Sequence, residues 1–226
     1  MAELTLSEQL LLLALRDEKG TVISRASMAL DFGLTGALLM ELALTDRIAV
    51  RDGKLGIMVS DPTGDPLLDE VLGHVVGRDG KPRPLRYWLP RLARKIRRLR
   101  HRVGDRLVQS GILRCERRRI LGIFPSVRYP TVNPLPELET RERLKSAILL
   151  DADPSKDTVV LAGLLKACNL VQEVFDKRTK KQALRRLRKL TADEPVSRAV
   201  GETVAAVQAA VTAAVTTAVI AGGSGR

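Results

Sequence analysis

Apolar residues recur at helical spacing along most of the chain. The clearest case is residues 91–108, where one stripe is formed by Leu92, Ile96, Leu99, Val103 and Leu107. Similar spacing predicts further helices over residues 4–15, 33–44, from 67 onward, 137–149, 158–175, 177–191 and 195–221. We therefore expect a mainly α protein, built as a single helical-bundle domain.

Two segments have the alternating pattern of β-hairpins instead. Residues 47–59 are interrupted by Asp52 and Gly53 and predict a small hairpin. Residues 112–117 and 123–129 predict a second, protruding hairpin. Its turn, residues 120–124, is apolar, although exposed hairpin tips normally carry polar residues. This tip therefore either packs into the protein's own core or enters something else.

Polar residues mark the ends of several elements. Asp65 and Pro66 are placed to cap the helix that begins near Leu67, and residues 77–84, rich in Gly and Pro, predict a loop.

In residues 203–221 valines recur every three or four positions among Ala and Thr. That pattern favours a packed terminal helix over a membrane span, for which Leu and Phe would be more typical.

Composition narrows the class of protein. The chain has 226 residues, of which 45% are apolar and only 3% aromatic, so its core must be built from Leu, Val, Ile and Ala. Two cysteines, Cys115 and Cys168, cannot make a disulfide framework and predict reduced thiols in a cytoplasmic protein. We expect one domain over residues 1–221 and a flexible tail over 222–226.

Positive charge is concentrated in one stretch. Residues 81–119 contain fifteen of the 38 Lys and Arg residues but only two acids, which gives this stretch a charge of +13. The whole chain is +12, so all its other residues together sum to −1. Such a surface attracts nucleic acid, anionic membranes or phosphorylated headgroups. Because apolar residues 120–124 follow directly, a lipid surface suits the pattern better than a polynucleotide.

The predicted basic helix has two charged flanks. Arg97 and Arg100 lie on one side of the apolar stripe, and the other side carries Arg91, Lys95, Arg102 and Arg106. A solvated face on a core helix would account for the second flank. It would not explain why so few acids in the neighbouring sequence balance either one.

Signals for catalysis or metal binding are weak. His74 and His101 fall on different predicted elements without ligand spacing. Asp65, Asp69 and Glu70 fit the cap and first turn of a helix better than a catalytic carboxylate pair. We therefore expect no enzyme, no cofactor and no metal.

Several motifs together resemble the Golgi phosphoprotein 3 family. The match begins with Leu-Thr-Leu-Ser-Glu at residues 4–8 and Asp-Glu-Lys-Gly at 17–20. It continues with Gly-Leu at 33–34, Glu-Leu-Ala-Leu at 41–44, Pro-Thr-Gly-Asp at 62–65 and Leu-Leu-Asp-Glu at 67–70. Arg97, Arg100, Arg102 and Gly-Ile-Leu at 111–113 lead into the hairpin. The resemblance covers residues 3–215, and the Pro-Thr-Gly-Asp segment in this register is its most specific part.

This resemblance implies a mostly helical domain that binds phosphatidylinositol 4-phosphate on a membrane face. The two pocket arginines of the family's basic helix correspond to Arg97 and Arg100. A pocket Trp and a further Arg fall on Arg25 and Thr35, so half of the specific pocket is substituted. The family's inserting hairpin tip falls on Ile120, Leu121, Ile123 and Phe124.

The predominance of Arg over Lys and the Ala-rich C-terminal segment are similar to the bacterial branch of the family, so a Golgi role is not transferred. We expect a cytoplasmic protein attached peripherally to the inner membrane face. Its expected partner is an anionic phospholipid membrane, with phosphatidylinositol 4-phosphate as a candidate headgroup. A protein client and a homo-oligomer are left open.

The main alternative is a winged-helix-like DNA-binding protein, in which the basic helix enters the major groove and the hairpin is the wing. It explains the charge but leaves Leu121, Ile123 and Phe124 facing phosphates. A small hydrolase or transferase is a more distant alternative, because no constellation of residues supports it.

Overall fold

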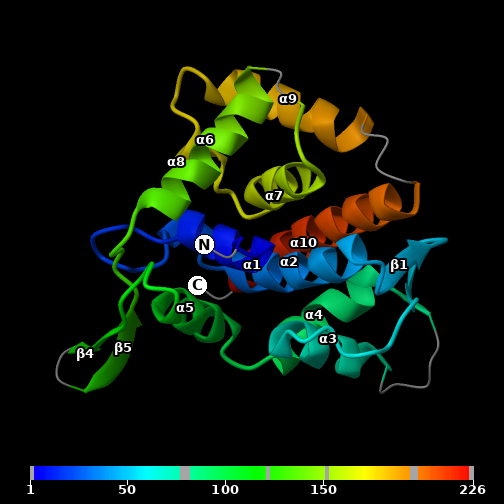
Figure 1. Ribbon diagram of the computed structural model, residues 1–226, viewed down its shortest axis with the longest axis horizontal. Helices are drawn as coiled ribbons and strands as arrows, with labels where there is room; N and C mark the ends of the chain where they lie inside the picture. Colours follow the sequence, from blue (N-terminus) through cyan, green and yellow to red (C-terminus); the bar gives the residue numbers. More distant parts are fainter. Residues whose placement is uncertain (1–2, 77–81, 121–122, 151–152, 194–197, 224–226) are drawn as a thin grey trace.

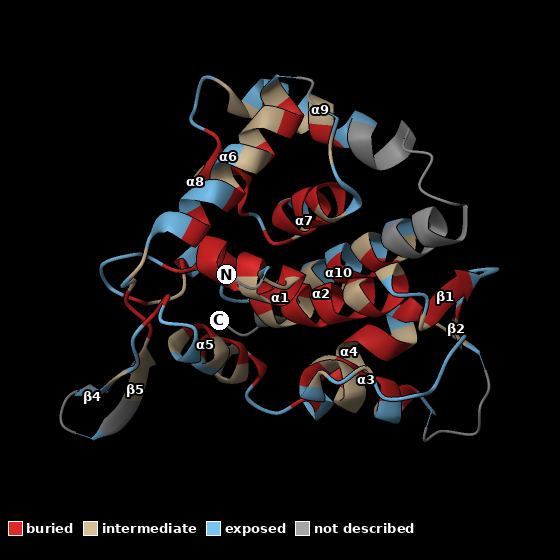
Figure 2. Ribbon diagram, in the orientation of Figure 1, coloured by how far each residue is buried: buried red, intermediate tan, exposed pale blue. Residues whose placement is uncertain are grey.

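The structure is a computed structural model that describes residues 3–76, 82–120, 123–150, 153–193 and 198–223. Two helices, α1 (Leu6–Ala14) and α2 (Leu30–Leu44), pack together at its centre (Figure 1). Leu10 to Leu13 are at most 1% exposed, and α2 is buried on almost every side (Figure 2). Thr5 begins α1 with a capping box, in which its hydroxyl accepts from Glu8 and Glu8 accepts from the Thr5 N–H.

The other helices surround this central pair. On one side lie α3 (Pro66–Val76), α4 (Leu85–Lys95) and α5 (Leu99–Gln109). On the other side are α6 (Leu135–Leu149), α7 (Lys156–Ala167), α8 (Val171–Val174) and α9 (Lys180–Asp193) (Figure 1). The last helix, α10 (Arg198–Gly223), packs on α2, α4 and α7. The prediction of a mainly α fold is confirmed.

The terminal helix packs as predicted. Val207 and Val211 of α10 are fully buried. The helix reaches Gly223, two residues past the expected domain boundary. No described helix combines the length and the apolar character that a bilayer span requires.

Two small antiparallel sheets complete the fold. In the first, β1 (Ile48–Arg51) pairs with β2 (Lys54–Ile57) through a turn in which both Asp52 and Gly53 have positive φ, and β2 pairs with β3 (Arg83–Pro84). The hairpin was predicted, but β3 falls where a loop was expected. In the second, β4 (Glu116–Ile120) pairs with β5 (Phe124–Arg128). Its first strand begins four residues later than expected.

Two predicted helices are each divided in the structure. Residues 91–108 are not one helix: α4 ends at Lys95, and Arg98 adopts a left-handed conformation (φ 56°) before α5. Likewise, Asn169 (φ 57°) separates α7 from α8. The apolar periodicity could not reveal the first break, because Ile96 and Leu99 on either side of it are both buried.

The base of the β4–β5 hairpin is anchored in the core. Tyr129 follows β5 and is 6% exposed, and its hydroxyl donates to Asp105 Oδ1 at 3.0 Å. Its ring lies so close to Gly104 that a Cβ there would come within 2.8 Å of it. Gly20 (φ 59°) accepts from the Tyr129 N–H at 2.8 Å, and a side chain at this position would collide with the Tyr129 backbone. The hairpin therefore projects from a rigid attachment.

Asp65 joins two elements. Its Oδ1 accepts from the N–H groups of Leu67 and Leu68 and so caps α3, and both of its carboxylate oxygens accept from Arg106 of α5 at 2.7 and 2.5 Å. Partial burial alone would raise the pKa of Asp65. The bonds from Arg106 and the backbone outweigh that effect and lower it.

Glu41 of α2 has the opposite behaviour. Burial raises its pKa from 4.5 to about 7, although Oε1 accepts from the Ser7 N–H at 3.0 Å. The folded protein therefore keeps Glu41 protonated over a pH range in which the unfolded chain has lost that proton.

We expect Asp65→Ala to lower the free energy of unfolding by about 2 kcal/mol at pH 7, because it removes a helix cap and leaves Arg106 without its partner. Chemical denaturation measures this loss, with Asp61→Ala as the control in the same loop. Asp65 contributes stability above the pKa of an unfolded aspartate, about 3.9, and loses it as pH falls through the lower folded pKa. A loss that persisted unchanged at pH 2 would contradict the ionic part of this account.

We expect the stability of the protein to fall as pH rises from 4.5 to about 7, because ionisation of Glu41 is unfavourable in the fold. Glu41→Gln keeps an acceptor for Ser7 and removes the charge. It should raise the free energy of unfolding at pH 8 by up to about 3 kcal/mol and change it little at pH 5. An equal effect at both values would mean that contacts, and not ionisation, are responsible.

Candidate functional site

Three arginines of the basic stretch pair with acids that are distant in sequence. Arg100 Nε donates to Asp31 Oδ1 at 2.5 Å, Arg102 pairs with Glu70, and Arg106 pairs with Asp65. These carboxylates come from α2, α3 and the loop before α3. The inference that few acids balance the two flanks was therefore wrong, because the balancing acids lie outside the local sequence.

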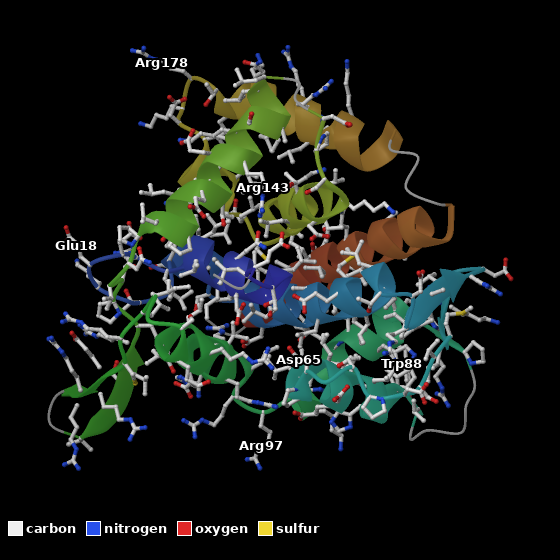
Figure 3. All side chains as sticks on the ribbon, viewed as in Figure 1. Glu18, Asp65, Trp88, Arg97, Arg143 and Arg178 are labelled. Carbon is white, nitrogen blue, oxygen red and sulfur yellow. The ribbon has the colours of Figure 1, made fainter. Side chains whose placement is uncertain are left out.

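The break between α4 and α5 forms a corner that projects its cations. Arg97 and Arg98 are both exposed, and the side chain of neither has a hydrogen bond or ion pair within the part of the chain that the structure describes. Figure 3 shows Arg97 pointing away from the fold at the lower edge of the view. The sequence had singled out Arg97 but given no role to Arg98, which the left-handed turn exposes.

Arg100 lies in the first turn of α5 and is held more tightly. Besides its bond to Asp31, its Nη2 donates to the carbonyl oxygen of Ser27 at 2.5 Å, and its side chain is 27% exposed. The sequence predicted that Arg97 and Arg100 share one face of a continuous helix. They do not, because Arg97 precedes α5 and Arg100 lies inside it. Their environments also differ: Arg97 is free, and Arg100 is already bonded.

The other two predicted headgroup residues are not available beside this corner. Arg25, in the short 3₁₀ helix Ser24–Ala26, forms an ion pair with Glu173 at 2.9 Å. Thr35 is fully buried in α2, and its hydroxyl donates to the Asp31 carbonyl at 2.7 Å. Thr35 therefore cannot reach a headgroup in this structure, and the prediction for it is corrected.

The β4–β5 hairpin adds a second group of cations. Arg117 and Arg119 alternate along β4, so they lie on one face of the strand, and both are exposed. On the other side Glu116 accepts from Arg114 at 2.8 Å and from Arg118 at 3.0 Å. The hairpin projects from the same lower edge as Arg97 (Figures 1 and 3).

At the tip, Ile123 is 75% exposed. Leu121 lies outside the described residues, and so do the side chains of Ile120 and Phe124. The backbone of Ile120 pairs with that of Phe124 at the end of the ladder. For Ile123, the alternative of packing into the protein's own core is contradicted by its exposure.

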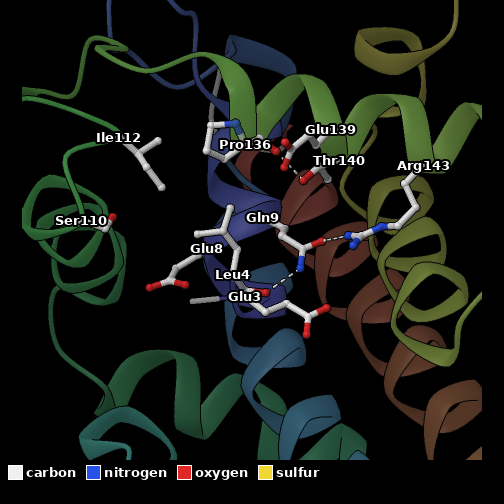
Figure 4. Close-up of a pocket in the computed structure, with 10 residues that line it drawn as sticks. All are labelled: Glu3, Leu4, Glu8, Gln9, Ser110, Ile112, Pro136, Glu139, Thr140 and Arg143. Atoms are coloured by element: carbon white, nitrogen blue, oxygen red, sulfur yellow. Dashed lines mark hydrogen bonds between the residues drawn. The ribbon is translucent and has the colours of Figure 1, made fainter. Parts of the chain in front are cut away.

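A separate cleft of about 390 Å³ lies between α1 and α6 (Figure 4). Gln9 there accepts from Arg143 and donates to the Leu4 carbonyl at 2.6 Å. Carboxylates of Glu3, Glu8 and Glu139 also line it. This acidic cleft does not suit an anionic ligand.

The two histidines and Asp69 have structural partners. His74 Nε2 lies 3.9 Å from Glu70, and His101 Nδ1 lies 3.2 Å from the Tyr129 hydroxyl. Asp69 accepts from the N–H and hydroxyl of Thr63, both at 2.6 Å. Cys115 and Cys168 are free thiols, and burial raises the pKa of Cys168 to about 12. Within the described ranges, no group of three or more His, Cys, Asp or Glu is arranged to hold a metal ion.

The chain is similar to known proteins over most of its length. The sequence profile of Golgi phosphoprotein 3 (GPP34) matches residues 6–207. Vacuolar protein sorting-associated protein 74 of Eremothecium gossypii is 29% identical over 167 residues, which cover 65% of this chain and 48% of that protein. The chain thus spans about half the length of this curated relative. Because the profile extends over nearly the whole described fold, the chain belongs to the Golgi phosphoprotein 3 family.

Proposed function

We propose that this protein is a peripheral membrane adaptor that binds anionic phospholipid headgroups, phosphatidylinositol 4-phosphate or others of similar charge. One observation carries the proposal: the unpaired Arg97 and Arg98 lie at the same edge as a hairpin that bears Arg117, Arg119 and the exposed Ile123. Family membership supports the same class of ligand. Attachment would be to the inner face of the membrane, without catalysis.

The two kinds of contact would act together. Near an anionic surface each Lys or Arg contributes about 1 kcal/mol, and this contribution falls off within a Debye length. Fully burying an Ile side chain contributes up to about 3 kcal/mol, of which shallow insertion realises a part. Arg100 would add a bonded, partly neutralised cation beside the corner, because Asp31 already offsets its charge.

Selectivity among anionic lipids should be limited. Neither the substituted position Arg25 nor Thr35 offers a wall or a free charge beside Arg97, since one is paired with Glu173 and the other is buried. Binding would then follow total negative charge more than headgroup shape. Phosphatidylglycerol should compete well with phosphatidylinositol 4-phosphate.

The DNA-binding alternative is less well supported. A recognition helix needs free donors on an exposed face, but Arg100, Arg102 and Arg106 of α5 bond to Asp31, Glu70 and Asp65. The exposed Ile123 would also face phosphates if the hairpin were a wing.

Reversing the charge of the corner should reduce membrane binding. We expect Arg97→Glu with Arg98→Glu to lower the affinity for anionic vesicles at least about tenfold at physiological salt, measured by flotation. Vesicles in which phosphatidylglycerol or phosphatidylinositol 4-phosphate supplies the same total charge should give similar losses.

The matched control is Lys177→Glu with Arg178→Glu. It makes the same change in net charge at an exposed site, and Figure 3 places Arg178 at the opposite edge from Arg97. Equal losses for the two pairs would mean that net charge alone matters. If the protein bound duplex DNA in a gel shift with higher affinity than it bound anionic vesicles in flotation at the same salt, the nucleic-acid alternative would be favoured.

Placing a charge at the hairpin tip should separate insertion from folding. Because Ile123 is already 75% exposed, we expect Ile123→Asp to leave thermal stability unchanged and to reduce flotation several-fold. Leu150→Asp is the control, since Leu150 is 76% exposed beyond the end of α6 and away from this edge. Undiminished flotation of the Ile123 variant would exclude a role for its side chain in insertion.

A further inference from the structure

An apolar groove lies where α10 and α4 meet the start of α2. Its volume is about 970 Å³. Ala210, Ala213, Ala214, Thr217 and Ala218 line it along α10 at helical spacing. Because these side chains are small, they leave a hollow along the helix where larger residues would fill the space.

The opposite wall of the groove is more strongly hydrophobic. Met28 lies in the turn just before α2, Phe32 lies in the first turn of α2, and Pro90 and Ala93 come from α4. Met28 is 50% exposed, and Phe32 is only partly buried. A continuous apolar surface of this kind in contact with water is costly and indicates a ligand or partner.

Two cations line the same groove. The Arg86 side chain is exposed and has no hydrogen bond or ion pair in the described ranges. Arg94 Nε donates to the Pro90 carbonyl oxygen at 3.3 Å. The terminal nitrogens of Arg94 have no partner among those residues. Asp31 is the acid in the lining, and its carboxylate is bonded to Arg100. The groove therefore combines an apolar trough with two available guanidinium groups.

We propose that this groove holds the acyl chain of a single anionic amphiphile whose headgroup is bound by Arg86 and Arg94. The inference rests on the proposed function, because two residues of the groove lining are close to the corner at the proposed membrane edge: Asp31 holds Arg100, and Arg94 lies three residues before Arg97. Charge complementarity favours this occupant over a neutral chain. It gives the protein a second lipid contact, apart from the hairpin tip.

The experiment uses the full chain and dodecyl phosphate below its micelle concentration, with binding measured by calorimetry. Inorganic phosphate tests the headgroup alone, and dodecyl maltoside tests the chain alone. We expect saturable binding of dodecyl phosphate to one site, with either control probe at least about tenfold weaker. Binding as tight for inorganic phosphate as for dodecyl phosphate would overturn the proposal.

Ala213→Trp is designed to fill the groove from an exposed position on α10. Ala209→Trp is the matched control, because Ala209 is also exposed on α10 and is not part of the lining. We expect the first variant to weaken dodecyl phosphate binding about tenfold and the second to leave it unchanged. Equal affinities for the two variants would overturn the proposal.

Two further measurements separate the ways in which the inference can fail. Wild-type protein that floats with anionic vesicles but does not bind dodecyl phosphate would overturn the groove proposal and leave the proposed function intact. Protein that binds dodecyl phosphate but does not float would contradict the proposed function instead. If sedimentation shows a dimer that Ala213→Trp makes monomeric, a second copy of the chain occupies the groove and the amphiphile proposal is wrong.

Discussion

The docking of α5 is the constraint on which the basic surface depends. Its apolar stripe, Leu99, Val103 and Leu107, is at most 4% exposed and fixes which side of the helix faces the core. With that side fixed, the flanks of the helix meet carboxylates of α2 and α3, and three arginines become bonded. A surplus of charge that looks uniform in the sequence is thereby divided into structural cations and free ones.

The free cations owe their position to backbone geometry. Arg98 takes a left-handed conformation that non-glycine residues adopt at a cost, and this turn separates α4 from α5. Burial of Ile96 and Leu99 on either side holds the turn in place. A partner that approaches the corner therefore meets Arg97 and Arg98, whose side chains have no hydrogen bond or ion pair to break in the described structure. Binding there would not require loss of a salt bridge.

The hairpin combines a fixed base with a projecting end. Tyr129, Gly20 and Gly104 secure the base through close packing and hydrogen bonds. No such contact reaches Ile123 among the described residues, and it remains 75% exposed. A rigid attachment matters for a membrane contact, because an apolar end that is already held outward loses little conformational entropy when it meets a lipid surface.

The sequence by itself determined the features that depend on near neighbours. The caps at Thr5 and Asp65, the turn at Asp52 and Gly53, the helical stripes and the surplus of arginines are all set by residues within a few positions of one another. Only the tertiary structure decided which arginines are free, that residues 91–108 form two helices, and that Thr35 is buried. The reason is distance along the chain: Arg100 meets Asp31 from 69 residues away, Arg106 meets Asp65 from 41, and Arg102 meets Glu70 from 32. Periodicity within a window of one or two turns contains no information about such partners.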